Sequence, residues 1–96
     1  IIKGVRIKVE RVKEGGFLPL YLLNEAKLRF RKPGDLIDIE GKRGLKLKKF
    51  FEKHKVPFYL RDYILVLEYK GKIVWIEGFK PFITGKDLKI EVIKWK

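Results

Sequence analysis

Alternating apolar and polar side chains predict β-strands over much of the chain. In residues 5–12, Val5, Ile7 and Val9 share one face and charged side chains the other, which is the pattern of a half-buried strand. Three further segments are strand-like: 28–30, 36–40 and 88–95. Residues 17–26 fit either a short helix or an irregular apolar segment, and the pattern does not decide between them.

Two nearly continuous apolar runs indicate the centre of a sheet. The runs occupy residues 64–69 and 72–78 and flank the dipeptide Lys70-Gly71. Strands that are covered on both faces lose the alternation of half-buried strands. A two-residue connection that ends in Gly is typical of a tight β-hairpin, so we expect the two runs to pair.

One helix is predicted in the stretch GKRGLKLKKFFEKHKVP, residues 41–57. Its apolar positions follow the helical spacing i, i+3, i+4 and i+7: Leu47, Phe50, Phe51 and His54. Pro57 ends the helix, because the residue before a proline disfavours helical geometry. A second short turn or helix is expected at 58–62.

Together these elements predict an α+β fold, a small and mainly antiparallel sheet with one or two short helices packed on one face. No internal repeat or linker is visible, so residues 1–96 are expected to form a single domain. A chain of this length buries roughly 60–65% of its unfolded surface.

The charge balance predicts a polyanionic partner. The chain carries 24 Lys and Arg against 12 Asp and Glu, a net charge of +12. Such an excess favours binding to nucleic acid or to an anionic membrane surface. No run approaches the ~20 apolar residues that a membrane span needs, and no signal-peptide pattern opens the chain, so the parent protein is expected to be cytoplasmic.

Missing residue types argue against an active site. The chain has no Cys, no Ser and a single His, so neither nucleophilic catalysis nor a metal site has its usual residues. We therefore expect no catalytic and no metal-binding residues. Abundant Lys and Glu with few thermolabile residues suggest a thermophilic source. The chain begins with Ile and contains no Met, which suggests a piece of a longer protein.

Basic residues gather at the predicted start of the helix. Residues 41–55 hold seven basic residues and one acid. Three of the seven, Lys42, Arg43 and Lys46, crowd the helix N-terminus, which already carries partial positive charge. This arrangement disfavours the free domain and suits a bound phosphate. Lys46, Lys49 and Lys53 form one stripe along the helix, and the alternative for that stripe is an ordinary solvated lysine face.

The same segment contains a Gly-x-x-Gly pattern, Gly41-Lys42-Arg43-Gly44. KH domains clamp a nucleic-acid backbone with such a loop, but theirs joins two helices while this one follows an apparent strand. We reject the KH assignment and keep the physical point, that a glycine-flanked basic turn lets a phosphate approach closely. Within the helix, Lys48 and Glu52 are spaced to form an i, i+4 ion pair.

Further basic candidates lie on both sides of the helix. Arg29 and Arg31 share one strand face and either contact a second phosphate or are ordinary solvent-side residues, with Asp35 placed to orient them. Arg61 stands among aromatic residues and needs a partner, either an acid or a phosphate. The neighbouring aromatics are expected mainly in the core, with base stacking as the alternative: Phe58, Tyr59 and Tyr63. His54 is expected to be a partly buried residue at the helix end.

The ordered set of these segments resembles the C-terminal domain of tRNA(Ile)-lysidine synthase. The segments that carry the resemblance are RFRKPGDLI (29–37), GLKLKKFFEKHKVP (44–57), an aromatic pair with Arg61, and ILVLEYKGKIVWIEG (64–78). They cover roughly residues 28–79. Two positions depart from the family pattern, since Tyr59 or Phe58 replaces a usual Trp and Ile64 replaces a frequent Pro.

The resemblance implies a role within a larger enzyme. Members of that family use ATP, with magnesium, to attach lysine to the wobble cytidine of the isoleucine tRNA with a CAU anticodon. That chemistry belongs to an N-terminal domain with a Ser-Gly-Gly-rich ATP motif, and this chain has no serine. The chain is thus expected to be a non-catalytic, tRNA-binding C-terminal domain without a cofactor of its own, whose partners are this tRNA and the N-terminal catalytic domain. The resemblance also suggests contact with the acceptor end or elbow of the tRNA.

Two other functions stay open on the residues alone. One is a general RNA- or DNA-binding module of another protein, which the same positive charge would serve. The other is a membrane-surface anchor formed by the helix LKLKKFFEKHK. Its apolar stripe is also needed to cover the sheet, so no membrane partner is expected.

Overall fold

A computed structural model of the chain describes residues 4–39 and 42–94. The chain divides into two compact units. The first combines the residues up to Tyr21 with those from Thr84 onward, and the second spans Leu22–Ile83.

The first unit contains a two-stranded antiparallel ribbon. Strand β1 (Val5–Arg11) pairs along its whole length with β7 (Leu88–Lys94), which confirms both terminal strands. The expected half-burial of β1 is only partly right, because Val9 is exposed while Val5 and Ile7 are half-buried. A two-stranded ribbon has few apolar partners to offer, so its faces stay partly open.

The undecided segment 17–26 is mainly irregular. Leu18 forms an isolated antiparallel bridge with Leu88 and is fully buried. A single turn of 3₁₀ helix, η1 (Leu20–Leu22), follows it. The apolar character of the segment therefore reflects local burial rather than a regular helix.

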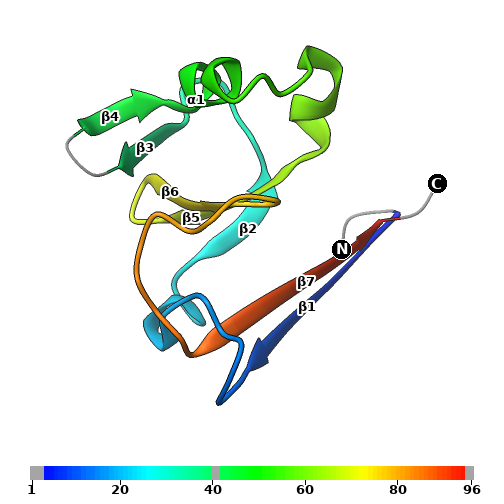
Figure 1. The fold of residues 1–96 in the computed structure, drawn as a ribbon, viewed down its shortest axis with the longest axis vertical. Coiled ribbons are helices and arrows are strands. Elements are labelled where there is room, and N and C mark those ends of the chain that lie inside the picture. Colours follow the sequence, from blue (N-terminus) through cyan, green and yellow to red (C-terminus); the bar gives the residue numbers. More distant parts are fainter. Residues whose placement is uncertain (1–3, 40–41, 95–96) are drawn as a thin grey trace. The chain divides into compact units, whose positions relative to one another are not determined.

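The second unit is built on a five-stranded sheet with the order β2-β5-β6-β3-β4. The strands are β2 (Lys27–Phe30), β3 (Leu36–Ile39), β4 (Lys42–Lys46), β5 (Leu65–Tyr69) and β6 (Lys72–Ile76). All neighbouring strands are antiparallel except β3 and β6, which run parallel at Ile37 and Ile73. Figure 1 shows these strands with helix α1 beside β3 and β4. The α+β class and the mainly antiparallel sheet are thus confirmed.

The predicted central hairpin is present. Lys70 and Gly71 connect β5 to β6 and both have positive φ, 49° and 80°. Such a pair gives the connection the right-handed twist of the strands that it joins. The hairpin strands lie inside the sheet order, and most of their apolar residues are buried.

Helix α1 (Leu47–Lys53) is shorter than predicted and begins later. Its apolar positions Leu47, Phe50 and Phe51 are buried in one core cluster with side chains from β3, β5 and β6. These residues are therefore covered by the sheet and do not form an open membrane-binding face. Among residues 4–39 and 42–94, no helix has the length and apolar character needed to cross a membrane.

The second predicted helix is also present, as the 3₁₀ helix η2 (Phe58–Tyr63). Between the two helices the chain turns sharply at Lys55, whose φ of 55° lies in the left-handed region. Pro57 follows and precedes the first residue of η2.

Candidate nucleic-acid interface

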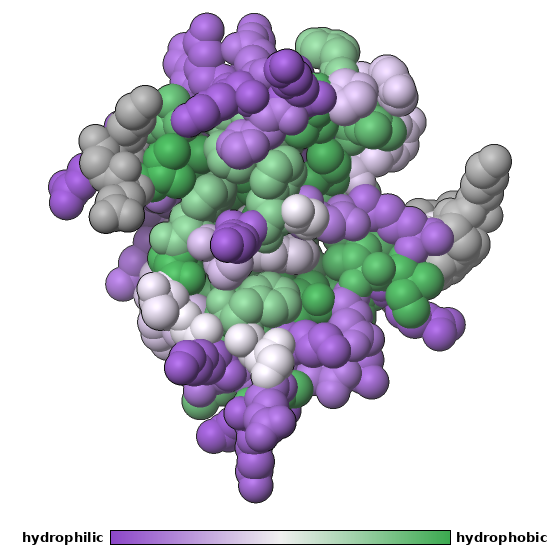
Figure 2. All heavy atoms as spheres, viewed as in Figure 1, coloured by the Kyte–Doolittle hydropathy of each residue, from purple (hydrophilic) through white to green (hydrophobic). Residues whose placement is uncertain are grey.

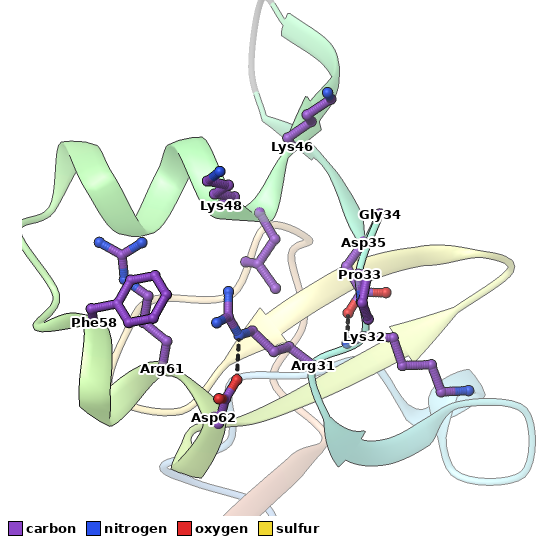
Figure 3. Close-up of a pocket in the computed structure, with 11 residues that line it drawn as sticks. Arg31, Lys32, Pro33, Gly34, Asp35, Lys46, Lys48, Phe58, Arg61 and Asp62 are labelled. Carbon is purple, nitrogen blue, oxygen red and sulfur yellow. Dashed lines mark hydrogen bonds and ion pairs between the residues drawn. The ribbon is translucent and has the colours of Figure 1, made fainter.

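A cavity in the second unit, which we call the cationic cavity, has a volume of about 420 Å³. Three segments that are distant in the sequence line it: the β2–β3 loop, the junction of β4 with α1, and η2 (Figure 3). Five cationic side chains and two carboxylates contribute to its lining: Arg31, Lys32, Lys46, Lys48, Arg61, Asp35 and Asp62. The cavity therefore attracts anions.

An ion-pair network holds the β2–β3 loop in place behind the cavity. Arg29 donates two hydrogen bonds to the Asp35 carboxylate, at 3.0 and 2.8 Å, and a third to Glu68 at 2.9 Å. The backbone N–H of Lys32 also donates to Asp35, at 2.7 Å. The Asp35 carbonyl in turn accepts from the N–H of Leu47, at 2.9 Å. The network thus ties the loop to the start of α1.

This network shifts the pKa values of Asp35 and Arg29. Burial alone would raise the pKa of Asp35, but hydrogen bonds from Arg29 and from the Lys32 backbone lower it below its ordinary value. The hydrogen bond to Asp35 raises the pKa of Arg29. Asp35 orients Arg29, as the sequence suggested, while Arg31 pairs with a different acid.

Arg31 lies just beyond the end of β2 and faces the cavity. Its Nε donates to the Asp62 carboxylate at 2.9 Å, and its guanidinium carbon lies 5.9 Å from the centre of the Phe51 ring. Asp62 is well exposed, so solvent screens this ion pair. The two terminal nitrogens of the Arg31 guanidinium carry further N–H donors, which can turn toward a ligand.

Arg61 is the only charged residue that is buried among those the structure describes, with 8% of its surface exposed. Its Nε donates to the Val56 carbonyl at 3.1 Å. Its guanidinium carbon lies 5.9 Å from the Phe51 ring centre and 5.4 Å from that of Phe58. Within residues 4–39 and 42–94 no carboxylate forms an ion pair with it. Of the two partners expected for Arg61, the acid is therefore not found there.

The aromatic residues of η2 are not in the core, and this expectation was wrong. Phe58, Tyr59 and Tyr63 expose 71%, 75% and 67% of their surfaces. A helix of six residues cannot cover all of its side chains, and the core cluster of this unit is built from residues of α1 and the sheet. The sequence offered base stacking as the alternative, and exposure is the condition for that role.

The predicted basic helix start does not exist as such. Lys42 and Arg43 lie on strand β4, and only Lys46, at the N-cap, adjoins the helix. Pairing with β3 holds this segment extended, with Leu45 opposite Ile37 and Lys46 opposite Leu36. Lys42 and Arg43 are thus strand residues, and Lys46 alone of the three stands at the helix N-terminus.

The second glycine of the Gly-x-x-Gly pattern shapes this hairpin, while the first lies outside the described residues. Gly44 has a φ of 67°, and its N–H donates to the Asp38 carboxylate at 2.7 Å. The hydrogen bond from Gly44 and a second one from Lys72 lower the pKa of Asp38. Arg43, between the two glycines, is exposed to solvent.

The lysines of α1 are exposed, and the ion pair to Glu52 differs from the predicted one. Lys49, and not Lys48, approaches Glu52, at 3.7 Å and a spacing of i, i+3. Lys48 instead lines the cationic cavity, and Lys53 stays exposed in the last turn. Figure 2 shows hydrophilic side chains gathered over α1. His54 was expected to be partly buried but is exposed. Its ring lies against that of Phe50, with 4.3 Å between the two ring centres.

Sequence reasoning put neither Lys32 nor Lys48 among the RNA contacts, although both line the cavity, and it gave Phe58 base stacking only as the alternative to a place in the core. The Lys32-Pro33-Gly34 turn carried a signal for Lys32, because turn residues are exposed. Phe58 stands three residues before Arg61, a spacing that aligns side chains in a 3₁₀ helix.

Among the residues that the structure describes, no group of three His, Cys, Asp or Glu side chains is placed to hold a metal ion.

Comparisons with known proteins point to one family. The TilS substrate C-terminal domain family matches residues 26–91, which include every residue that lines the cationic cavity. The chain is 37% identical over 79 residues to the tRNA(Ile)-lysidine synthase of Bacillus subtilis (strain 168), covering 74% of this chain and 16% of that protein. It is 36% identical over 93 residues to the tRNA(Ile)-lysidine synthase of Lactococcus lactis subsp. lactis (strain IL1403), covering 95% of this chain and 22% of that protein.

A more distant relative is the tRNA(Ile)-lysidine synthase of Thermotoga maritima, which is 28% identical over 97 residues, or 95% of this chain and 23% of that protein. The chain thus spans less than a quarter of the length of these relatives. No solved structure matches the chain significantly.

Proposed function

Because the chain belongs to the TilS substrate C-terminal domain family, we propose that it is the tRNA-binding C-terminal domain of a tRNA(Ile)-lysidine synthase. The whole enzyme would ligate lysine to the wobble cytidine of the isoleucine tRNA with a CAU anticodon, at the expense of ATP. Its catalytic N-terminal domain would hold ATP and magnesium and would work beside this chain in the cytoplasm. The role of this chain is then to hold the tRNA.

The observation that carries the proposal is the cationic cavity within the family segment. Five basic side chains line it, and its buried arginine, Arg61, has no carboxylate partner among the described residues. A guanidinium presents its donors in a planar fork that matches phosphate geometry. The unmatched charge of Arg61 therefore supports phosphate as its ligand.

Most of the remaining candidate residues are proposed to contact phosphates, and one of them is proposed to hold a loop in place. Lys42, Arg43, Lys46, Lys49 and Lys53 are proposed to reach phosphates along the β3–β4 hairpin and α1. Their arrangement on adjoining elements suits A-form RNA, which proteins recognise by shape and backbone more than by base sequence. Arg29 donates to two acids, so in this proposal it holds the loop that presents Arg31, and it reaches RNA less directly.

A salt titration tests the electrostatic part of the proposal. If about five or six phosphates are neutralised, the logarithm of the tRNA association constant should fall against log[salt] with a slope of about −4 to −5. Fluorescence anisotropy with labelled tRNA between 50 and 300 mM salt measures the slope. A flat response would contradict phosphate binding.

Recovery of cellular RNA distinguishes this proposal from a general nucleic-acid module. The immobilised chain should enrich the isoleucine tRNA with a CAU anticodon if it serves a lysidine synthase. A general module would instead recover RNA in proportion to its abundance. Sequencing of the bound RNA separates the two outcomes.

A further inference from the structure

Phe58 combines high exposure with a place in the cavity lining. It is the first residue of η2 and exposes 71% of its surface. The cavity beside it is lined by five cations. An exposed aromatic ring beside concentrated positive charge is the combination that binds single-stranded nucleic acid.

The Phe58 ring lies against Arg61 and is otherwise largely exposed. The two residues are three apart in a 3₁₀ helix, so their side chains align. The Arg61 guanidinium carbon lies 5.4 Å from the centre of the Phe58 ring and 5.9 Å from that of Phe51, so the cation is close to two aromatic rings. Figure 3 shows the Phe58 ring beside Arg61 at the edge of the cavity.

We infer that the cationic cavity binds an unpaired RNA nucleotide, with its phosphate on Arg61 and Lys48 and its base stacked on Phe58. The inference rests on the proposed tRNA-binding function and adds a base contact to it. A base inside a duplex keeps both faces stacked on its neighbours and has none to offer, whereas an unpaired base can place a face on Phe58. The volume of about 420 Å³ lies in the range of pockets that hold small ligands.

Charge favours RNA over a protein partner at this surface. The centres of protein–protein interfaces are depleted of charged residues, and of lysine in particular. Here Lys32, Lys46 and Lys48 are exposed and line the same cavity as Phe58. A docked protein would have to bury these ammonium groups, while RNA would pair them with phosphates.

The test compares two RNA hairpins of equal charge. Both carry a 3′ overhang of four nucleotides, with normal bases in one and abasic sites in the other. Because the phosphates are identical, any difference in affinity measures contact with bases. The complete 96-residue chain should bind the overhang with bases about tenfold more tightly, since stacking on an aromatic side chain is worth about that factor per base.

Variants at Phe58 assign the difference to this ring. Phe58→Ala and Phe58→Leu should bind both hairpins equally, because neither offers a flat aromatic face, and Phe58→Trp should restore the preference. Tyr21→Ala is the matched control, since Tyr21 is an exposed aromatic residue outside the cavity lining. It should keep the tenfold preference. Circular dichroism checks that each variant is folded.

The possible outcomes separate this inference from the proposed function. Equal binding of both hairpins by the wild-type chain, with a steep salt dependence, would overturn the base contact and leave phosphate binding intact. A preference that persists in Phe58→Ala would also overturn the inference, because another residue would then hold the base. Failure to bind either hairpin or tRNA would overturn the inference and the proposed function together.

Discussion

Replacement of Lys32, Lys46 and Lys48 by glutamine should weaken tRNA binding by about a hundredfold at physiological salt. Each lost phosphate contact removes about 0.9 from the slope of log K against log[salt], which corresponds to roughly a fivefold loss per contact near 0.15 M salt. The three side chains come from the β2–β3 loop, the end of β4 and the start of α1, and all line the cationic cavity. Anisotropy titrations at several salt concentrations measure both the affinity and the slope.

The fold of this variant should be unaffected. All three lysines are exposed. Within the part of the chain that the structure describes, none of their side chains forms an ion pair. Surface substitutions of this kind usually change stability by less than about 0.5 kcal/mol. The melting temperature should therefore stay within a few degrees of that of the wild type.

The matched control removes the same charge elsewhere. Lys86, Lys89 and Lys94 lie on or just before β7, in the other compact unit, and outside the cavity lining. Their replacement by glutamine should weaken binding less than about fivefold. Equal losses in the two triple variants would mean that general positive charge, and not the cavity, attracts the RNA.

Replacement of Arg29 by methionine should destabilise the chain by about 3 kcal/mol, because removal of one member of a poorly exposed ion pair leaves a charge without its partner. The side chains of Arg29 and Asp35 are only 17% and 11% exposed. Glu68 would lose its bond from Arg29 as well. Urea unfolding followed by circular dichroism measures the difference.

A compensated variant separates charge from packing. Arg29→Met combined with Asp35→Asn and Glu68→Gln leaves no charge unpaired in the network, so it should recover a large part of the lost stability. If the triple variant is as unstable as the single one, the role of Arg29 lies in packing and not in pairing its two acids.

The effect of Arg29→Met should also depend on pH. The folded-state pKa of Asp35 lies below its ordinary value, so its stabilisation is complete above the unfolded-state pKa of about 4 and is lost as pH falls through the folded-state pKa. The stability gap between wild type and variant should therefore be largest near neutral pH and shrink as pH falls, beginning at the pKa of Asp35 in the variant, which burial without Arg29 raises. A gap that is independent of pH down to pH 2 would contradict this account.

The sequence determined those elements whose pattern is local and strong. Alternation placed β1 and β7, Lys70-Gly71 placed the central hairpin, and the spacing of Leu47, Phe50 and Phe51 placed the buried face of α1. In each case the periodicity of apolar residues and the required turn geometry agree, so no distant contact is needed to decide the outcome. The net charge of +12 likewise depends on composition alone, and it is the reason for proposing a polyanionic partner.

Tertiary structure alone decided the shape of the cavity and the state of its residues. Residues 42–46 carry no clear period, and they became a strand because β3 offers them a pairing partner. Arg29 reached Glu68, 39 residues away in the chain, and so became a residue that supports the fold. Phe58 remained outside the core cluster, which residues of α1 and the sheet form. Strand pairing, charge compensation and burial depend on which distant segments come into contact. A local pattern of residue types does not predict those contacts.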